Sequence, residues 1–174
     1  MTRALLPLIA ALSLAACAER GPDVTRAAAP AISNAALYPG ETAAMRALIR
    51  QYAREHQIPE ALLHRVIQRE SDYRAHARNG PYWGLMQILP QTAQQMGFQG
   101  RAEDLLDAET NLKYAGRYLR GAWLLSDGNI DRAVMWYARG YYYEARDRCM
   151  LVATGLRTRE VRRDCPAPRA TVAG

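Results

Sequence analysis

Apolar residues recur at intervals of three and four along the middle of this chain, which is the spacing of one face of an α-helix. Helices are predicted to begin near Glu41, at Pro59, after Asn111 and near Asp131, and a short helix is predicted from Pro90 to Gly97. No run of β-branched residues shows the alternation typical of a strand, so residues 72–83 are expected to be irregular. The sequence therefore predicts an all-α domain, to which we assign residues 41–148.

Glu70 is the one charged residue on the apolar face of the helix that is predicted from Pro59. It follows Val66 by four positions and Ile67 by three, and both separations return to the same helical face. Desolvation raises the pKa of such a carboxyl group, and an acid that stays protonated near neutral pH can protonate a glycosidic oxygen. The alternative is a buried ion pair with one of the arginines nearby in the sequence, which are Arg65, Arg69 and Arg74.

Residues 1–16 have the pattern of an export signal. One early positive charge precedes an apolar run that is too short for a comfortable membrane span, and small residues lead to Cys17. This arrangement resembles the bacterial lipobox, in which the cysteine is acylated and the chain is cut before it. We expect a lipoprotein signal peptide over residues 1–16, lipid on Cys17 and a flexible tether over residues 17–40. A plain secretory signal with an unmodified cysteine is the alternative.

The expected compartment is the periplasm. Ala18 follows the lipidated cysteine in place of the aspartate often linked to inner-membrane retention, so we expect an anchor in the outer membrane. If Cys17 carries lipid, Cys149 and Cys165 make an even pair in an oxidising compartment. We expect a disulfide between them, with two free thiols as the alternative. Residues 149–174 are expected to form a basic C-terminal extension.

The formal net charge of +6 favours anionic partners in general but does not choose among them. No nucleic-acid-binding motif accompanies the charge, and the export signal also argues against a nucleic-acid partner. The three histidines do not have the spacing of metal ligands. We therefore expect a monomer without metal, cofactor or nucleic acid.

Four short motifs occur in a fixed order: Arg69-Glu70-Ser71, Gly84-Leu85-Met86-Gln87, Asn111 through Tyr118-Leu119, and Trp136-Tyr137-Ala138-Arg139-Gly140. Together they resemble the catalytic domain of soluble-lytic-transglycosylase-like proteins, relatives of goose-type lysozyme. The resemblance implies an all-α, lysozyme-like fold with a groove for peptidoglycan glycan strands. It also implies cleavage of the β-1,4 bond between N-acetylmuramic acid and N-acetylglucosamine, with Glu70 as the catalytic acid. In that family the same carboxylate then acts as a base, and the muramyl C6 hydroxyl attacks C1 to give a 1,6-anhydro end.

The resemblance also implies a set of glycan-binding positions, which in this chain are Ser71, Asn79, Met86, Gln87, Leu89, Tyr118 and Tyr137. The amide of Gln87 suits N-acetyl groups because it both donates and accepts hydrogen bonds. The hydroxyl of Tyr137 is expected to orient the Glu70 carboxyl or an N-acetyl group. For Met86 and Leu89, plain core packing is the alternative.

The chain departs from the family pattern in several places, including Asn79 where a serine is often found and Ala115 where a glycine is expected. Ala138 stands where the family usually has asparagine, which puts the local geometry beside Tyr137 in question. After Gly140, three consecutive tyrosines replace the usual Gly-Pro-Gly, and we expect them to pack mainly on the surface. Two other functions therefore stay open besides the transglycosylase. One is a lysozyme-type hydrolase on the same fold, and the other is a catalytically silent peptidoglycan-binding lipoprotein.

Overall fold

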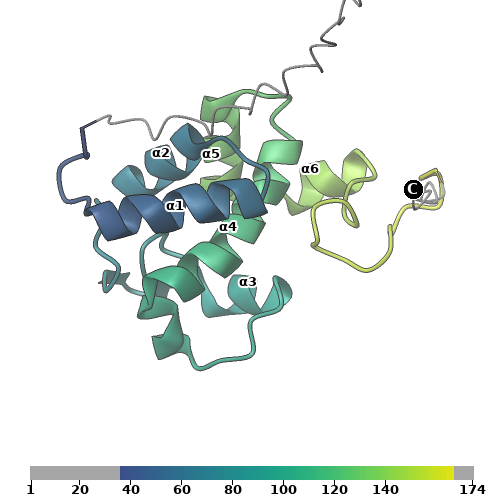
Figure 1. Ribbon diagram of the computed structural model, residues 1–174. Helices are drawn as coiled ribbons and strands as arrows, with labels where there is room; N and C mark the ends of the chain where they lie inside the picture. Colours follow the sequence, from purple (N-terminus) through teal and green to yellow (C-terminus); the bar gives the residue numbers. More distant parts are fainter. Residues whose placement is uncertain (1–35, 167–174) are drawn as a thin grey trace, which may run out of the picture. The chain divides into compact units, whose positions relative to one another are not determined.

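The computed structural model describes residues 36–166, so the expected signal peptide, Cys17 and most of the expected tether lie outside the described residues. The helices and strands follow one another in the order α1 (Ala43–Glu55), α2 (Glu60–Glu70), β1 (Arg78–Asn79), β2 (Tyr82–Trp83), α3 (Pro90–Gln95), the 3₁₀ helix η1 (Ala102–Leu106), α4 (Ala108–Leu124), α5 (Ile130–Arg139) and α6 (Tyr142–Asp147) (Figure 1). The regular secondary structure of the described residues is thus helical apart from one short hairpin, and the expected all-α fold class is confirmed. None of the helices in residues 36–166 combines the length and the apolar character needed to cross a membrane.

The longest helix, α4, packs against α1, α3, α5 and η1 and so lies at the centre of the helical body (Figure 1). Its face with Leu112 and Leu119 is completely buried, as the periodicity predicts. The helix begins at Ala108, about one turn earlier than expected, because the Asp107 side chain accepts a hydrogen bond from the Thr110 N–H. Aspartate is a favoured residue at this capping position, and its signal in the sequence was overlooked.

Helix α2 lies against α1 and α5 and positions Glu70. It buries Leu62, Leu63, Val66 and Ile67, the four apolar residues from which its face was predicted. Pro59 occupies the N-cap position directly before the first helical residue, so the helix begins one residue later than expected. Because Glu70 is the last residue of α2, its side chain lies at the end of the apolar face rather than within it.

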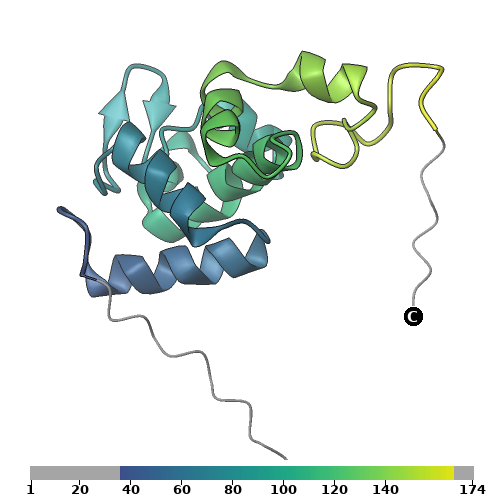
Figure 2. The same ribbon diagram turned by 90° about the horizontal axis from the view of Figure 1, so that it is seen from above.

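Residues 72–83 contain a hairpin, so the expectation that they are irregular was wrong for part of this stretch. Strands β1 and β2 pair antiparallel, with Arg78 opposite Trp83 and Asn79 opposite Tyr82, and the hairpin lies at the edge of the helical body (Figure 2). Each strand has only two residues, which is too short for an alternating pattern to show in the sequence.

The first of the three consecutive tyrosines belongs to the core, so the expectation of surface packing was wrong for it. Tyr141 is only 1% exposed, whereas Tyr143 is 69% exposed. The Tyr141 hydroxyl donates to the Tyr118 carbonyl at 2.7 Å and lies against Gly121 of α4, where a Cβ on the glycine would approach that hydroxyl to 2.2 Å. Gly121 therefore makes the room that lets the ring enter the core.

The chain after α6 also packs on the helical body. Leu151 is fully buried and Thr154 is 3% exposed. A disulfide joins Cys149 and Cys165, and Glu160 accepts hydrogen bonds from the backbone N–H groups of residues 151 and 152. Part of the expected C-terminal extension is thus held in place by a covalent bond and by core contacts.

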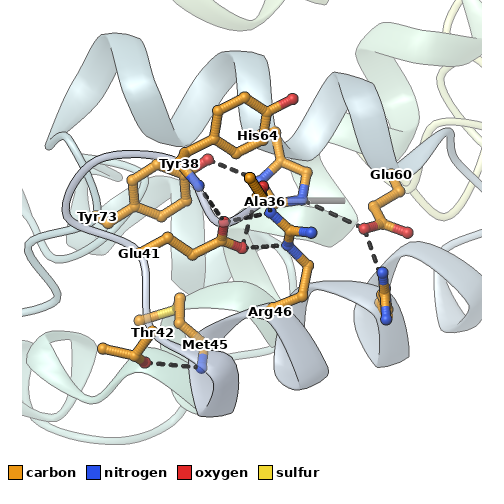
Figure 3. A network of polar contacts seen from close by, with 10 residues as sticks. Ala36, Tyr38, Glu41, Thr42, Met45, Arg46, Glu60, His64 and Tyr73 are labelled. Atoms are coloured by element: carbon orange, nitrogen blue, oxygen red, sulfur yellow. Dashed lines mark hydrogen bonds and ion pairs between the residues drawn. The ribbon is translucent and has the colours of Figure 1, made fainter. Parts of the chain in front are cut away.

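A buried polar cluster fixes the beginning of the compact unit (Figure 3). The guanidinium of Arg46 pairs with the Glu41 carboxylate, and both residues are less than a tenth exposed. Arg46 also donates to the Ala36 carbonyl, while the Tyr38 N–H donates to Glu41. Burial alone raises the pKa of Glu41, but the hydrogen bonds from Arg46 and Tyr38 outweigh it and the pKa is lowered. Residues 36–40, which we had assigned to the tether, therefore belong to the compact unit that begins at Ala36.

Candidate active site

Glu70 occupies a half-buried position at the C-terminal end of α2. Its side chain is 23% exposed, and burial raises its pKa while the positive charge of Arg69 lowers it, with a net increase above the ordinary value. The Arg69 Nε atom lies 3.5 Å from Glu70 Oε1, but the arginine side chain is 52% exposed. Solvent screens an ion pair of this kind, so the pair does not close off the carboxyl group.

Two adjoining cavities lie beside Glu70. The first has a volume of about 300 Å³ and is lined by Arg69, Glu70, Asn79, Tyr82, Gln87, Tyr137 and Ala138. The second, of about 220 Å³, shares Tyr82, Gln87, Tyr137 and Ala138 with the first and extends to Leu89 and Tyr118. Among the described residues that line these two cavities, Glu70 is the only carboxylate.

Six of the eight residues predicted for catalysis and glycan binding meet at these cavities: Glu70, Asn79, Gln87, Leu89, Tyr118 and Tyr137. The other two lie behind the cavity wall. Ser71 is 2% exposed and its hydroxyl donates to the Leu85 carbonyl at 2.7 Å, and the Met86 side chain is fully buried in the core. Both residues therefore support the site from inside the fold, and neither is among the residues that line the two cavities.

The loop between β2 and α3 carries several lining residues and is held by Asn111 of α4. The Asn111 side chain is completely buried. Its Oδ1 accepts from the Met86 N–H at 2.9 Å, and its Nδ2 donates to the carbonyls of Trp83 at 3.0 Å and Leu105 at 2.8 Å. Asn111 belonged to a motif matched in the sequence, but this role was not predicted for it.

Gly84 lets the loop approach Asn111 closely. Its φ angle of +75° is one that side-chain-bearing residues rarely adopt, and a Cβ there would come within 2.2 Å of the Asn111 amide nitrogen. The positive φ of Gln87 then turns the chain again, so that Met86 points into the core and Gln87 faces the cavities.

The polar groups of Gln87 and Tyr137 differ in what they leave for a ligand. The Gln87 amide nitrogen donates to the carbonyls of Ala77 and Gly84, so its oxygen is left as an acceptor. The Tyr137 hydroxyl donates to the Met86 carbonyl at 2.8 Å. Its one proton is therefore used inside the protein, which leaves the hydroxyl oxygen as the atom that can orient a protonated Glu70 carboxyl or an N-acetyl group, by accepting a hydrogen bond.

Tyr82 lines the site but was not predicted from the sequence. It lies on β2, lines both cavities and is 43% exposed, so it presents an aromatic ring to the space beside Glu70. Its position directly before Trp83-Gly84 was the one indication in the sequence. A two-residue strand shows no alternating pattern, so the side of the strand on which the Tyr82 side chain lies could not be predicted. Ala138, whose substitution for asparagine raised a question, lines both cavities with a small side chain.

Tyr118 contributes through its ring. It stacks on Tyr141 and meets Tyr137 edge to face, with ring centroids 4.7 and 5.5 Å apart. Burial raises the pKa of Tyr118 to about 12, so the phenol stays neutral in the physiological range.

Comparison with known proteins concerns the family of the chain. The search of solved structures found no match to the chain. A family model described as the transglycosylase SLT domain matches residues 47–147, a span that includes Glu70 and every residue lining the two cavities. Since this match covers more than half of the 174 residues, the chain belongs to the transglycosylase SLT domain family.

Proposed function

We propose that the protein is a lytic transglycosylase that cleaves the β-1,4 bond between N-acetylmuramic acid and N-acetylglucosamine in peptidoglycan. The observation that carries the proposal is the half-buried Glu70 with its raised pKa, which among the described residues is the only carboxylate lining two adjoining cavities. A carboxylic acid with a raised pKa retains its proton at higher pH, as a general acid requires.

In the proposed reaction, Glu70 acts twice. Its proton passes to the glycosidic oxygen as the bond from that oxygen to C1 of the muramyl residue breaks, and positive charge develops at C1. The Glu70 carboxylate then takes the proton of the muramyl C6 hydroxyl, and the C6 oxygen bonds to C1. Glu70 ends in its starting protonated state, no water is consumed and no oxidation or reduction occurs. One carboxylate is therefore sufficient.

The proposal of a transglycosylase rather than a hydrolase also rests on Glu70 being the only carboxylate among the described residues that line the two cavities. Hydrolases of glycosidic bonds generally use a second carboxylate, at about 5 Å as a nucleophile or about 6.5–9.5 Å as a base for water. The lining of the two described cavities supplies none besides Glu70. Digestion of sacculi in water enriched in oxygen-18, followed by mass spectrometry, separates the two reactions. A transglycosylase leaves unlabelled 1,6-anhydro ends, whereas a hydrolase leaves reducing ends that carry the label.

We expect Arg69→Gln to move the alkaline limb of the kcat/KM profile to higher pH. Activity requires protonated Glu70 and falls as the pH rises through its pKa. Arg69 lowers that pKa by its positive charge, so removal of the charge raises the pKa further. Arg65→Gln is the matched control, because Arg65 is also an exposed arginine of α2 but pairs with Asp131. A limb that stays in place or moves to lower pH would contradict the role of Glu70 as the acid.

We also propose that the protein is exported and anchored in the outer membrane by lipid on Cys17, which the lipobox-like sequence supports. The Cys17→Ser variant should lose incorporation of radiolabelled palmitate and leave the membrane fraction, because one polar side chain then replaces the acylated thiol. Labelling of intact cells and membrane fractionation check this. Equal labelling of the parent and the Cys17→Ser variant would contradict the proposal. The other two cysteines, Cys149 and Cys165, are joined in a disulfide and offer no free thiol for acylation.

A further inference from the structure

The loop after α2 forms a third cavity, which the proposed reaction does not use. It has a volume of about 580 Å³ and is lined by Arg74, Ala75, His76, Ala77 and Arg78. The two arginines and the histidine are exposed, while the alanines between them are half-buried. All the polar lining side chains carry N–H donors, and none of the lining residues is acidic. We call residues 74–78 the basic loop.

Both guanidinium groups of the basic loop are positioned by contacts with neighbouring residues. Arg74 Nε donates to the Ser71 carbonyl at 2.9 Å, and the Arg78 guanidinium lies 3.9 Å from the centre of the Trp83 ring. Within residues 36–166, neither arginine forms an ion pair with a carboxylate. Their remaining N–H groups are therefore available to a ligand, and the guanidinium shape matches a carboxylate or another planar oxyanion.

The basic loop is directly connected to the cavity of Glu70. The Ala77 carbonyl accepts a hydrogen bond from the Gln87 side chain at 3.1 Å, and Gln87 lines that cavity. Asn79, the neighbour of Arg78 on β1, lines it as well. Because successive side chains of a strand point to opposite faces, Arg78 lies on the other face of β1 from Asn79. A peptide branch of a strand bound beside Glu70 would therefore contact Arg78 by passing around the hairpin.

We propose that the basic loop binds a carboxylate of the peptide that branches from the glycan strand. This inference rests on the proposed function, which places the strand beside Glu70. The glycan backbone of intact peptidoglycan is uncharged, because its amino groups are acetylated and its lactyl groups are linked to peptide. The free carboxylates of the peptides are then the groups that two preorganised guanidiniums recognise. The loop makes the enzyme selective for strands whose peptides retain those charges.

The test is equilibrium binding of soluble, peptide-bearing glycan strands to the full chain carrying Glu70→Gln, so that no cleavage is needed for a result. The same strands are also treated with carbodiimide and ammonia, which converts the peptide carboxylates into neutral amides. Native strands are expected to bind about tenfold more tightly than amidated ones, the usual effect of a hydrogen bond to a charged group. Adding Arg78→Glu should abolish this difference and leave binding of amidated strands unchanged.

Arg54→Glu is the control for net charge, because Arg54 is an exposed arginine of α1 that lines none of the three cavities. It should retain the full preference for native strands. If the Arg78→Glu variant does not fold, Arg78→Gln, which removes the positive charge without adding a negative one, serves in its place.

Three results would overturn the inference. The Glu70→Gln chain could bind native and amidated strands equally, its preference for native strands could persist after Arg78→Glu is added, or Arg54→Glu could reduce that preference as much as Arg78→Glu does. Anionic phosphatidylglycerol vesicles provide a further arm. Binding to vesicles that depends on Arg78, with unchanged strand binding, would assign the basic loop to a membrane surface. Failure of the proposed function would be seen in a different measurement, because the chain with intact Glu70 would then cleave neither native nor amidated strands.

Discussion

The Glu70→Gln variant is expected to lose the release of 1,6-anhydro muropeptides from purified sacculi, with turnover lowered by roughly 10³-fold or more. Glutamine has nearly the same shape as glutamate, so the two cavities keep their lining. Its amide cannot give a proton to the glycosidic oxygen or take one from the C6 hydroxyl. Mass spectrometry of the soluble products measures the loss directly. Glu55→Gln, a change at an exposed glutamate of α1, should leave turnover unchanged.

Loss of activity in Glu70→Gln should not come from unfolding. Burial raises the pKa of Glu70 in the folded state, so the folded protein binds the proton of this carboxyl group more tightly than the unfolded chain does. As the pH rises from the ordinary value through the raised one, the ionised carboxylate makes the folded state less stable. At neutral pH the variant should therefore unfold at a temperature equal to or above that of the parent. Retained activity would contradict the catalytic role, and two inactive proteins would favour the silent, peptidoglycan-binding alternative.

Asn111→Ala is expected to lower the free energy of unfolding by about 3–5 kcal/mol, the largest effect on stability that we predict for a single side chain. The Met86 N–H and the Leu105 carbonyl lose the partner that Asn111 gives them, and the Trp83 carbonyl keeps only its bond from the Ile88 N–H. Each such group costs about 1–3 kcal/mol when it is left unsatisfied. The loop that carries Gln87 should also lose its fixed position, so turnover falls together with stability.

Thermal unfolding followed by circular dichroism checks this prediction, and the midpoint should fall by roughly 10 °C. Asn111→Asp is informative beside it, because a carboxylate still accepts from Met86 but donates to neither carbonyl. It should also be destabilised. Asn79→Ala removes an exposed asparagine and should leave the midpoint within about 2 °C of the parent, as surface substitutions usually do. A similarly small change in Asn111→Ala would show that the loop does not depend on these hydrogen bonds.

The parts of the fold that could be predicted from the sequence are those set by local periodicity. The buried face of α2 and the position of Glu70 at its end follow from spacings of three and four, which hold wherever a helix packs on a core. The hairpin could not be predicted, because each two-residue strand is defined by pairing across a turn. The burial of Tyr141 depends on Gly121, a residue of another helix, and no pattern within the tyrosine run encodes that contact.

The site shows the same division at the level of single side chains. The motif Gly84-Leu85-Met86-Gln87 lies in a loop beside the cavities, but its letters do not indicate which side chains face them. Met86 and Gln87 are adjacent, yet one is fully buried and the other lines both cavities. Their directions depend on positive φ angles at Gly84 and Gln87 and on the distant Asn111. Contacts of this kind join segments far apart in the chain, so one sequence without its fold does not reveal them.

The cluster around Arg46 has a practical consequence for any excised fragment of this protein. The family match begins at residue 47 and helix α1 at Ala43, so either boundary would remove Glu41 from a recombinant piece. A piece that begins at Ala43 keeps Arg46 without its buried counter-charge, an arrangement that costs several kcal/mol. A piece that begins at residue 47 loses Arg46 as well and therefore the whole ion pair. The shortest piece expected to fold by itself begins at Ala36, ahead of both boundaries.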